Sequence, residues 1–362
     1  SLLQSFEGSD VIVDDQASSL YPDQITDEFI KITEHYTSTM QKSNEEVAEM
    51  IEADEIDILI YLAGRFDENR PIVAAHRPAP VQVSLFAGTT TAIEGMDYCL
   101  TDGVLHPDDT TERFTEDLYR LPSLFTYPRP ERTPPVSGLP ADENGYVTFA
   151  SFNKPSKMND RVLDLWADVL GAVPDARLML KFRNYLASPL ISRRILARFE
   201  KNGIAPGRVR LLDGQDSFQE HLARYAQADI ALDTFPFSGA TTTFQALWMG
   251  VPVISLMGGR FSSRAGGSIS THTGLGDLAV ESDNAFVEHA VALAADLPHG
   301  QLTETVLEES GYTDMQKADW LTGQTRLDNL KELVQAMQGF DTLQAWLEHV
   351  SLVMDVERAS GD

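Results

Sequence analysis

The amino-acid sequence predicts an α/β protein built around parallel, doubly wound sheets. Three observations support this class. The chain has 362 residues, enough for two or three domains. Its composition, 43% hydrophobic and 23% charged, is that of a chain that buries sizeable cores. Between residues 146 and 256, apolar runs alternate with amphipathic segments, which indicates strands alternating with helices.

The first third of the chain is predicted to form one helix and three strands. Apolar residues at mainly helical spacing predict a helix over 26–53. The unbroken apolar run at 56–64 ends in glycine and is typical of a buried parallel strand. Two more strands are predicted over 80–88 and 96–102.

The middle of the chain repeats a strand–helix unit. The predicted strands cover 146–152, 176–182, 208–213, 229–235 and 251–256. The predicted helices cover 160–173, 188–203, 218–228 and 241–250. Ser188 is placed to cap the second of these helices and Gly203 to end it. In sheets of this kind, ligands bind beyond the carboxyl ends of the strands.

The remaining segments define the expected domain boundaries. Residues 127–140 contain five prolines and predict an irregular linker. Two amphipathic helices, over 324–337 and 340–354, follow each other without a strand between them. We therefore expect a first domain over 1–130, a second over 131–296 and a helical tail over 297–362.

Charge is unevenly distributed along the chain. The formal net charge is −27 overall, with −17 in 1–130, −2 in 131–296 and −8 in 297–362. Only the middle part therefore lacks a strong negative charge that would repel an anionic ligand. The alternative is that the acidic surfaces simply keep the protein soluble. A chain this acidic is a poor non-specific binder of nucleic acid, so no nucleic-acid partner is expected.

Several protein classes are excluded by what the sequence lacks. With Cys99 as its single cysteine, the chain contains neither an internal disulfide framework nor a cysteine-based zinc site. No run of 18 uncharged apolar residues and no signal peptide is present, so we expect a cytoplasmic protein without a membrane partner. The motifs HExxH, GxSxG, GxGxxG and the P-loop are absent, which argues against zinc proteases, serine hydrolases, ordinary Rossmann dehydrogenases and P-loop NTPases.

The most informative constellation follows the predicted strand that Asp233 ends. A Gly239–Ala240 step leads to three threonines, 241–243, at a helix N-terminus. Backbone N–H groups, the helix dipole and hydroxyls at such a position suit a phosphate. Gln245 lies on the same side of the helix and is placed to hydrogen-bond a ribose. The alternative is that the threonines only cap a helix.

A second constellation lies at SFNKPSKMND, residues 151–160. A predicted strand ends at Phe152, and Asn153, Lys154 and Lys157 occupy the turn before a helix. Both lysines are placed to meet a diphosphate at a strand's carboxyl end, or they are simply solvated surface lysines. Adjacent loops of one sheet converge on one ligand, so the two constellations reinforce each other.

Isolated histidines and a glycine-rich segment are weaker indications. His76 precedes a strand and His221 lies in a predicted helix, and such lone histidines are more often structural. Arg264 and His272 lie in the glycine-rich segment 258–276, which either moves over a ligand or is simply a loop.

Five ordered motifs resemble a known family. They are RPAPVQV (77–83), MDYCLTD (96–102), VTFASFNKPSKM (147–158), DIALDTFPFSGATTTFQALWMGVPVIS (229–255) and SRAGGSISTHTGLGDLA (263–279). Over about residues 25–296 they resemble the catalytic region of the O-GlcNAc transferase/SPINDLY family, glycosyltransferase family 41. The resemblance implies a GT-B fold of two Rossmann-like domains, with the nucleotide sugar on the second and an acceptor polypeptide in the cleft. It also implies inverting transfer to Ser or Thr with no cofactor and no obligatory metal.

The resemblance assigns roles to individual residues. Lys157 matches the family lysine that meets the donor diphosphate and assists the leaving group. Thr241 and Thr242 match threonines that start the phosphate-binding helix, and His221 matches a histidine near the base. Gln245 stands where O-GlcNAc transferases have a ribose-binding aspartate and SPINDLY-like sequences a glutamate, so both UDP-GlcNAc and GDP-fucose remain possible donors. Further expected donor-binding residues are Phe152, Asn153, Lys154, Lys181, Gly239, Thr243 and Arg264, and the acceptor-side candidates are His76, Thr89 and Thr90.

The resemblance is incomplete at both ends. The family's first strand, its following loop and the upstream helical repeats are expected to precede residue 1, so the first domain is expected to be truncated. From about residue 297 the sequence instead resembles a fragment of a UvrD-type superfamily 1 DNA helicase. This fragment stops short of any ATP-binding motif and implies neither ATPase nor unwinding activity. The alternative function is therefore a truncated or chimeric remnant that at most binds a nucleotide.

Overall fold

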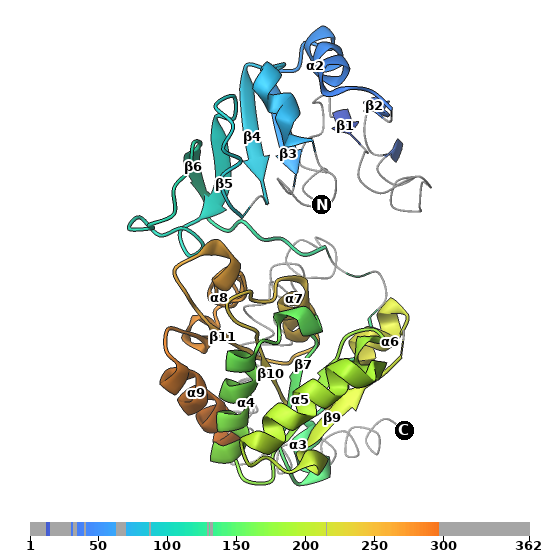
Figure 1. Ribbon diagram of the computed structural model, residues 1–362, viewed down its shortest axis with the longest axis vertical. Coiled ribbons are helices and arrows are strands. Elements are labelled where there is room, and N and C mark those ends of the chain that lie inside the picture. The colour runs from blue at the N-terminus through green and yellow to red at the C-terminus, as the bar shows by residue number, and fades with distance from the viewer. Residues whose placement is uncertain are drawn as a thin grey trace, which may run out of the picture. The chain divides into compact units, whose positions relative to one another are not determined.

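A computed structural model describes residues 12–14, 30–31, 35–39, 41–62, 70–86, 88–128, 130, 133–214 and 216–296. The chain divides into two compact units, Ser1–Pro128 and Arg129–Asp362 (Figure 1). We call them unit 1 and unit 2 and describe each by itself. The helices expected over 324–337 and 340–354, and the helicase-like tail, lie outside the described residues.

Unit 1 contains a four-stranded parallel sheet in the order β3-β4-β5-β6. Its strands are β3 (Ile58–Leu62), β4 (Val81–Leu85), β5 (Tyr98–Asp102) and β6 (Asp117–Leu121). Helix α2 (Asn44–Ala53) and the 3-10 helix η2 (Pro71–His76) pack together, and their buried residues Val47, Ala48 and Val73 contact Tyr61 of β3. A separate two-stranded parallel ladder joins β1 (Ile12–Asp14) to β2 (His35–Thr37).

The structure corrects three predictions in unit 1. The single helix expected over 26–53 is wrong in its middle: residues 30–31 are helical, but His35–Thr37 pairs with β1 as a strand, and α2 begins only after Ser43. Ser43 and Glu46 form a reciprocal capping box there, which favours this start over an earlier one. The strand predicted over 56–64 was expected to be buried, but it is only partly buried, because Ile58 is 59% and Leu62 54% exposed. Strand β6 was not predicted, because its residues mix charged and apolar side chains and contain no continuous apolar run.

Unit 2 is built on a six-stranded parallel sheet in the order β12-β11-β10-β7-β8-β9. Its strands are β7 (Thr148–Ser151), β8 (Arg177–Lys181), β9 (Val209–Leu212), β10 (Ile230–Leu232), β11 (Val253–Leu256) and β12 (Ala279–Val280). Strands β7, β8 and β9 follow one another from the centre of the sheet to one edge. The chain then returns to the centre, and β10, β11 and β12 follow one another to the other edge. This is the doubly wound arrangement that the alternating pattern predicts, and its strand order reverses between β7 and β10.

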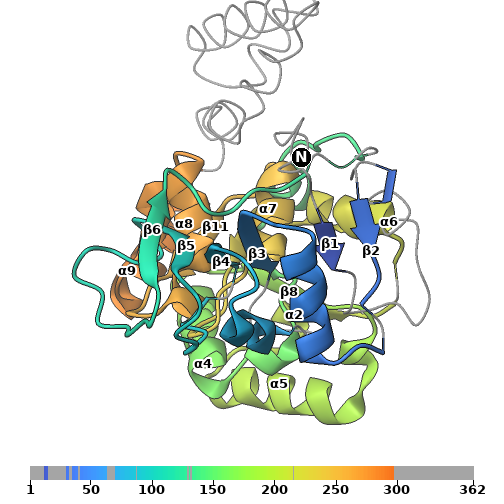
Figure 2. The same ribbon diagram turned by 90° about the horizontal axis from the view of Figure 1, so that it is seen from above.

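Helices cover the sheet of unit 2. They are α3 (Pro140–Asn144), α4 (Asp160–Ala172), α5 (Pro189–Lys201), α6 (Phe218–Ala223), α7 (Thr241–Trp248), α8 (Ala265–His272) and α9 (Asp283–Asp296). Helix α4 packs between α5 and α9 (Figures 1 and 2). The core beneath it contains the fully buried Trp166 and Phe149. Parallel crossovers are right-handed, and the strand order reverses at β10. Helices α7 and α8 therefore lie on the face of the sheet opposite α4 and α5.

The predicted helix boundaries in unit 2 need small changes. Ser188 occupies the N-cap position of α5, but its side chain makes no capping bond, and Pro189 starts the helix. Gly203 ends α5 with a φ of +78°, as predicted. The helix expected over 218–228 is α6 followed by the 3-10 turn η6 (Arg224–Gln227).

The glycine-rich segment 258–276 is not simply a loop, because it contains α8. Two of its glycines, Gly266 and Gly267, are required by close packing. A Cβ at Gly266 would lie 2.2 Å from Asp233 Oδ2, and one at Gly267 would lie 2.1 Å from Met257 Sδ.

Candidate functional site

The candidate site of unit 2 lies where the strand order reverses, at the carboxyl ends of β7 and β10. Phe152 and Asn153 follow β7 directly, and the 3-10 turn η3 (Pro155–Lys157) comes next. Asp233 follows β10. The strand geometry thus brings together the two segments that the sequence singled out.

Asp233 is the buried centre of this region. Its Oδ1 accepts hydrogen bonds from the backbone N–H groups of Gly239 at 2.7 Å and Thr234 at 2.8 Å. Oδ2 accepts from Ser255 Oγ at 2.8 Å, and Asn153 Nδ2 donates to Oδ1 at 3.3 Å. Burial raises the pKa of Asp233, while these hydrogen bonds act in the opposite direction. Sequence reasoning placed Asp233 at the strand end but did not identify it as a site residue.

Lys157 reaches across from the β7 side to the loop after β10. Its Nζ donates to the Ser238 carbonyl oxygen at 2.8 Å and lies 4.3 Å from the centroid of the Phe237 ring. Burial lowers the pKa of Lys157, and the negative charge of Asp233 opposes that change. Among the described residues no carboxylate forms an ion pair with Lys157. The ammonium is therefore not neutralised by a direct partner.

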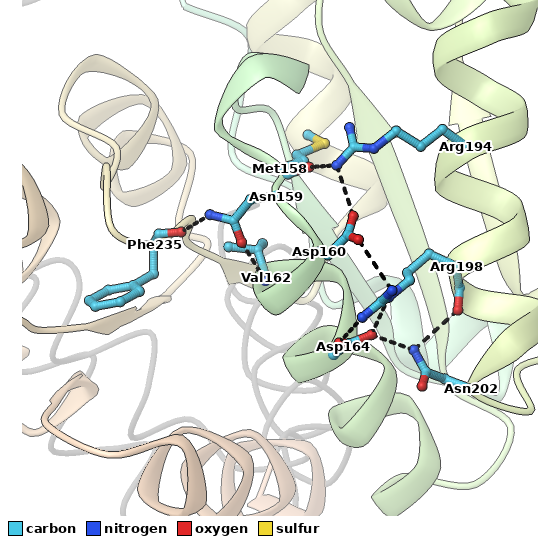
Figure 3. A network of polar contacts seen from close by, with 9 residues as sticks. All are labelled: Met158, Asn159, Asp160, Val162, Asp164, Arg194, Arg198, Asn202 and Phe235. Carbon is cyan, nitrogen blue, oxygen red and sulfur yellow. Dashed lines mark hydrogen bonds and ion pairs between the residues drawn. The ribbon is translucent and has the colours of Figure 1, made fainter.

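The turn that carries Lys157 is held on its other side by Asn159. The Asn159 side chain accepts from Val162 N at 3.0 Å as the N-cap of α4, and its Nδ2 donates to the Phe235 carbonyl at 2.6 Å (Figure 3). The carbonyl of the buried Met158 accepts from Arg194 of α5 at 2.6 Å. Asn159 was missed, although an Asn immediately before a predicted helix is a recognisable N-cap.

A set of ion pairs joins α4 to α5 beyond that turn. Arg194 and Arg198 of α5 both contact Asp160 of α4, and Arg198 also binds Asp164 (Figure 3). Asn202 donates to Asp164 at 2.7 Å. These contacts set the position of α4, whose first turn follows directly from Lys157.

The N-terminus of α7 faces the same region. Its N-cap is Ala240, which has no side-chain capping bond, so the threonines do not act as the cap. Thr242 Oγ1 donates to Asn153 Oδ1 at 3.3 Å, Thr243 is buried and Thr241 is exposed. A Cβ at Gly239 would lie only 2.6 Å from Thr242 Oγ1. The first-turn N–H groups of a helix without a cap are suited to an anion.

His221 and Gln245 form a pair beside an aromatic cluster. His221 Nε2 lies 3.0 Å from Gln245 Oε1, and because an amide oxygen only accepts, Nε2 carries the proton. The His221 ring lies 5.6 Å from the Phe152 ring and 5.8 Å from the Tyr225 ring, between centroids. Burial lowers the pKa of His221. Tyr225 was missed; its hydroxyl donates to the Thr242 carbonyl at 3.2 Å.

The other basic candidates of unit 2 are arranged differently. Lys181, at the end of β8, is 2% exposed and pairs with Asp216 at 2.6 Å, an acid that Arg224 also contacts. Arg264 donates to the Gly258 carbonyl at 2.8 Å, and Lys154 is exposed. Lys181 is therefore held by Asp216, and its charge acts on the nearby His221, whose pKa it helps to lower.

The acceptor-side candidates of unit 1 lie at opposite ends of β4. His76 is exposed and precedes the strand, whereas Thr89 and Thr90 follow its carboxyl end. Thr90 Oγ1 donates to Glu116 Oε2 at 2.7 Å, and the Thr91 N–H donates to Glu116 Oε1 at 2.6 Å. Burial alone would raise the pKa of Glu116, but these hydrogen bonds lower it. Glu116, which fixes this loop, was not found from the sequence.

Two further properties concern metal ions and membranes. In the described part of the chain, no group of three or more His, Cys, Asp or Glu side chains is arranged to hold a metal ion. None of the helices described is both long enough and apolar enough to cross a membrane.

Comparisons with known proteins agree with this geometry. The chain is 39% identical over 254 residues to rice (Oryza sativa subsp. japonica) SPINDLY, described as a probable UDP-N-acetylglucosamine–peptide N-acetylglucosaminyltransferase; the match covers 69% of this chain and 27% of that protein. It is 32% identical over 304 residues to Arabidopsis thaliana SEC, which carries the same description, over 77% of this chain and 29% of that one. The chain thus spans under a third of the length of these plant relatives.

A solved structure extends the likeness to three dimensions. A mutant of the Thermobaculum terrenum O-GlcNAc transferase matches with a TM-score of 0.74 and 32% identity, over 87% of this chain and 59% of that one. Together with the two parallel α/β units, this confirms the predicted GT-B class.

The profile of one family covers most of the chain, at residues 13–127 and 135–309. It begins before the predicted start at 25 and continues past residue 297, where the resemblance was expected to end. Every segment of the candidate site, from Phe152 to Arg264, falls within it. The chain therefore belongs to glycosyl transferase family 41.

Proposed function

We propose that this chain is the catalytic part of an inverting glycosyltransferase that moves a sugar from UDP-GlcNAc or GDP-fucose to Ser or Thr hydroxyls of proteins. The observation that supports this most directly is the placement of Lys157 opposite the uncapped N-terminus of α7. The names of the plant relatives support a nucleotide-sugar donor and a peptide acceptor.

The proposed chemistry is a single displacement. The acceptor hydroxyl attacks the anomeric carbon of the sugar from the face opposite the diphosphate. The new C–O bond forms as the bond to the β-phosphate oxygen breaks, and the hydroxyl proton is released. Negative charge grows on the departing diphosphate, where Lys157 and the first-turn N–H groups of α7 stabilise it without a metal ion.

The nucleoside part of the donor is proposed to lie along the His221–Gln245 pair. Phe152 and Tyr225 provide the apolar side of this region. Their rings lie 4.2 Å apart between centroids, and both lie next to the His221 ring. His221 is a neutral imidazole because burial lowers its pKa, so it offers a hydrogen-bonding edge rather than a charge.

The test is a transfer assay with Lys157→Ala. We expect kcat to fall by a factor of about 100 to 1000, the usual effect of removing one preorganised electrostatic group. Transfer of a labelled sugar from each donor to a mixture of Ser- and Thr-containing peptides is measured. Lys201→Ala is the matched control, because Lys201 is an exposed lysine at the end of α5 and is not among the predicted donor-binding residues.

Full activity of Lys157→Ala would overturn the assignment of Lys157. A wild-type chain that binds a nucleotide but transfers no sugar would instead favour the remnant that only binds.

A further inference from the structure

Asp233 is a fully buried carboxylate that the proposed reaction does not use. The inference below concerns its relation to Lys157, and it rests on the proposed function of that lysine. Four groups donate to Asp233: the N–H groups of Thr234 and Gly239, Ser255 Oγ and Asn153 Nδ2. A carboxylate accepts from all four, whereas a protonated acid would need an acceptor for its own proton. The hydrogen-bonding pattern thus favours the ionised form, although burial opposes it.

One peptide group joins Asp233 to Lys157. The Gly239 N–H donates to Asp233 Oδ1 at 2.7 Å, and the Ser238 carbonyl accepts from Lys157 Nζ at 2.8 Å. These two groups are opposite ends of the same Ser238–Gly239 peptide. Its dipole therefore runs between the carboxylate and the ammonium in the direction that both charges favour.

The surroundings hold this peptide in place. Ser238 N and Ser238 Oγ both donate to the Ser262 carbonyl, at 2.8 and 3.0 Å. Gly266 N, at the start of α8, donates to Ser238 Oγ at 3.1 Å. A Cβ at Gly266 would collide with Asp233 Oδ2, so α8 closes tightly over the carboxylate.

We propose that Asp233 is a positioning residue for Lys157: through the Ser238–Gly239 peptide it fixes the carbonyl that receives the ammonium, and its charge keeps that half-buried amine protonated. Burial destabilises the charged form of Lys157, and the negative charge of Asp233 stabilises it. The other charged groups on the adjoining elements have partners of their own or are exposed: Lys154, Asp160 bound by Arg194 and Arg198, Arg161 over the Phe235 ring, and Arg264 on the Gly258 carbonyl.

Asp233→Asn tests this proposal. An asparagine keeps the shape, lets Oδ1 accept from the same N–H groups and lets Nδ2 donate to Ser255 Oγ, so that mainly the charge is lost. Ser255→Ala is the matched control, because it removes one hydrogen bond to Asp233 and leaves the charge. In all three proteins, Lys157 is titrated by pH-dependent acetylation with acetic anhydride, followed by mass spectrometry.

We expect the pKa of Lys157 to fall by about one unit or more in Asp233→Asn and to stay at the wild-type value in Ser255→Ala. The alkaline limb of kcat for sugar transfer should move to lower pH by the same amount. An unchanged Lys157 titration in a cooperatively folded Asp233→Asn protein would overturn the proposal. Should that variant give no cooperative melt, the wild-type titration decides: Lys157 that is protected from acetylation at neutral pH, as a protonated amine is, supports the proposal, and Lys157 that reacts fully there overturns it.

The acetylation readout needs no turnover. If the wild-type chain transfers no sugar, the proposed function fails, but the titration of Lys157 still tests the role of Asp233.

Discussion

The candidate site of unit 2 is organised by polar side chains whose partners come from other strands and helices. His221 of α6 meets Gln245 of α7, and Asn153 after β7 meets Thr242 of α7. Gln245 is 7% exposed, so its amide oxygen is committed to His221 rather than to solvent. The neutral Gln245 thus has a defined partner in His221.

His221 predicts a pH dependence of stability. Its pKa is lowered in the folded chain, chiefly by burial, so below about pH 6.5 the unfolded chain binds more protons. The free energy of unfolding therefore falls as the pH drops below that value, at up to about 1.4 kcal/mol per pH unit for this one group. In His221→Phe this contribution disappears, and chemical denaturation of both proteins between pH 5 and about 7.5 measures the difference.

The control for this comparison is Leu190→Ala, because Leu190 is 77% exposed and carries no titratable group. This variant should keep the wild-type slope, and His106, whose pKa burial also lowers, contributes equally to each protein. Parallel pH profiles for His221→Phe and the wild type would contradict the prediction.

At the scale of elements, the turn from β7 into α4 determines where Lys157 lies. Asn159 caps α4 and binds the Phe235 carbonyl, while the α4–α5 ion pairs fix the helix behind it. These ion pairs are largely exposed and contribute little stability individually. Asn159 is the more important residue, because it both caps α4 and links the lysine turn to the loop after β10.

Asn159→Ala should destabilise the chain and reduce catalysis together. Loss of the cap costs about 1 kcal/mol of the free energy of unfolding, and the looser turn lowers kcat for sugar transfer. Ser43→Ala is the matched control, since Ser43 caps α2 in unit 1. It should cost a similar amount of stability without the loss of kcat; equal kcat in the two variants would refute the positioning role of Asn159.

At the scale of the whole molecule, the prediction concerns the nucleotide. Binding to unit 2 should raise the melting temperature of the chain with UDP or with GDP, whichever base the site accepts. A nucleotide at 100 times its Kd adds about 2.7 kcal/mol to the native state. Differential scanning calorimetry of the chain alone and with each nucleotide measures the shift. No shift with either nucleotide would argue against a formed donor site.

The doubly wound parallel sheet of unit 2 and the lysine turn could be predicted because they depend on local pattern. Apolar strands alternate with capped helices there, and the carboxyl ends of parallel strands share an edge. Residues 35–37, β6 and α8 could not be predicted in the same way. A strand pairing with β1, an exposed edge strand and a helix containing Gly266 and Gly267 each depend on a neighbour distant in the chain.

The sequence by itself determined the parallel α/β class, the segments that meet at the β7–β10 reversal and the family resemblance, because periodicity and motifs are properties of nearby residues. Only the tertiary structure decided which partner each side chain has. It pairs Lys181 with Asp216, gives Lys157 no ion pair with any acid in the described part of the chain, and places Asp233 behind the Ser238–Gly239 peptide. The physical reason is that hydrogen bonds, burial and charge act between atoms close in space, whatever their distance along the chain.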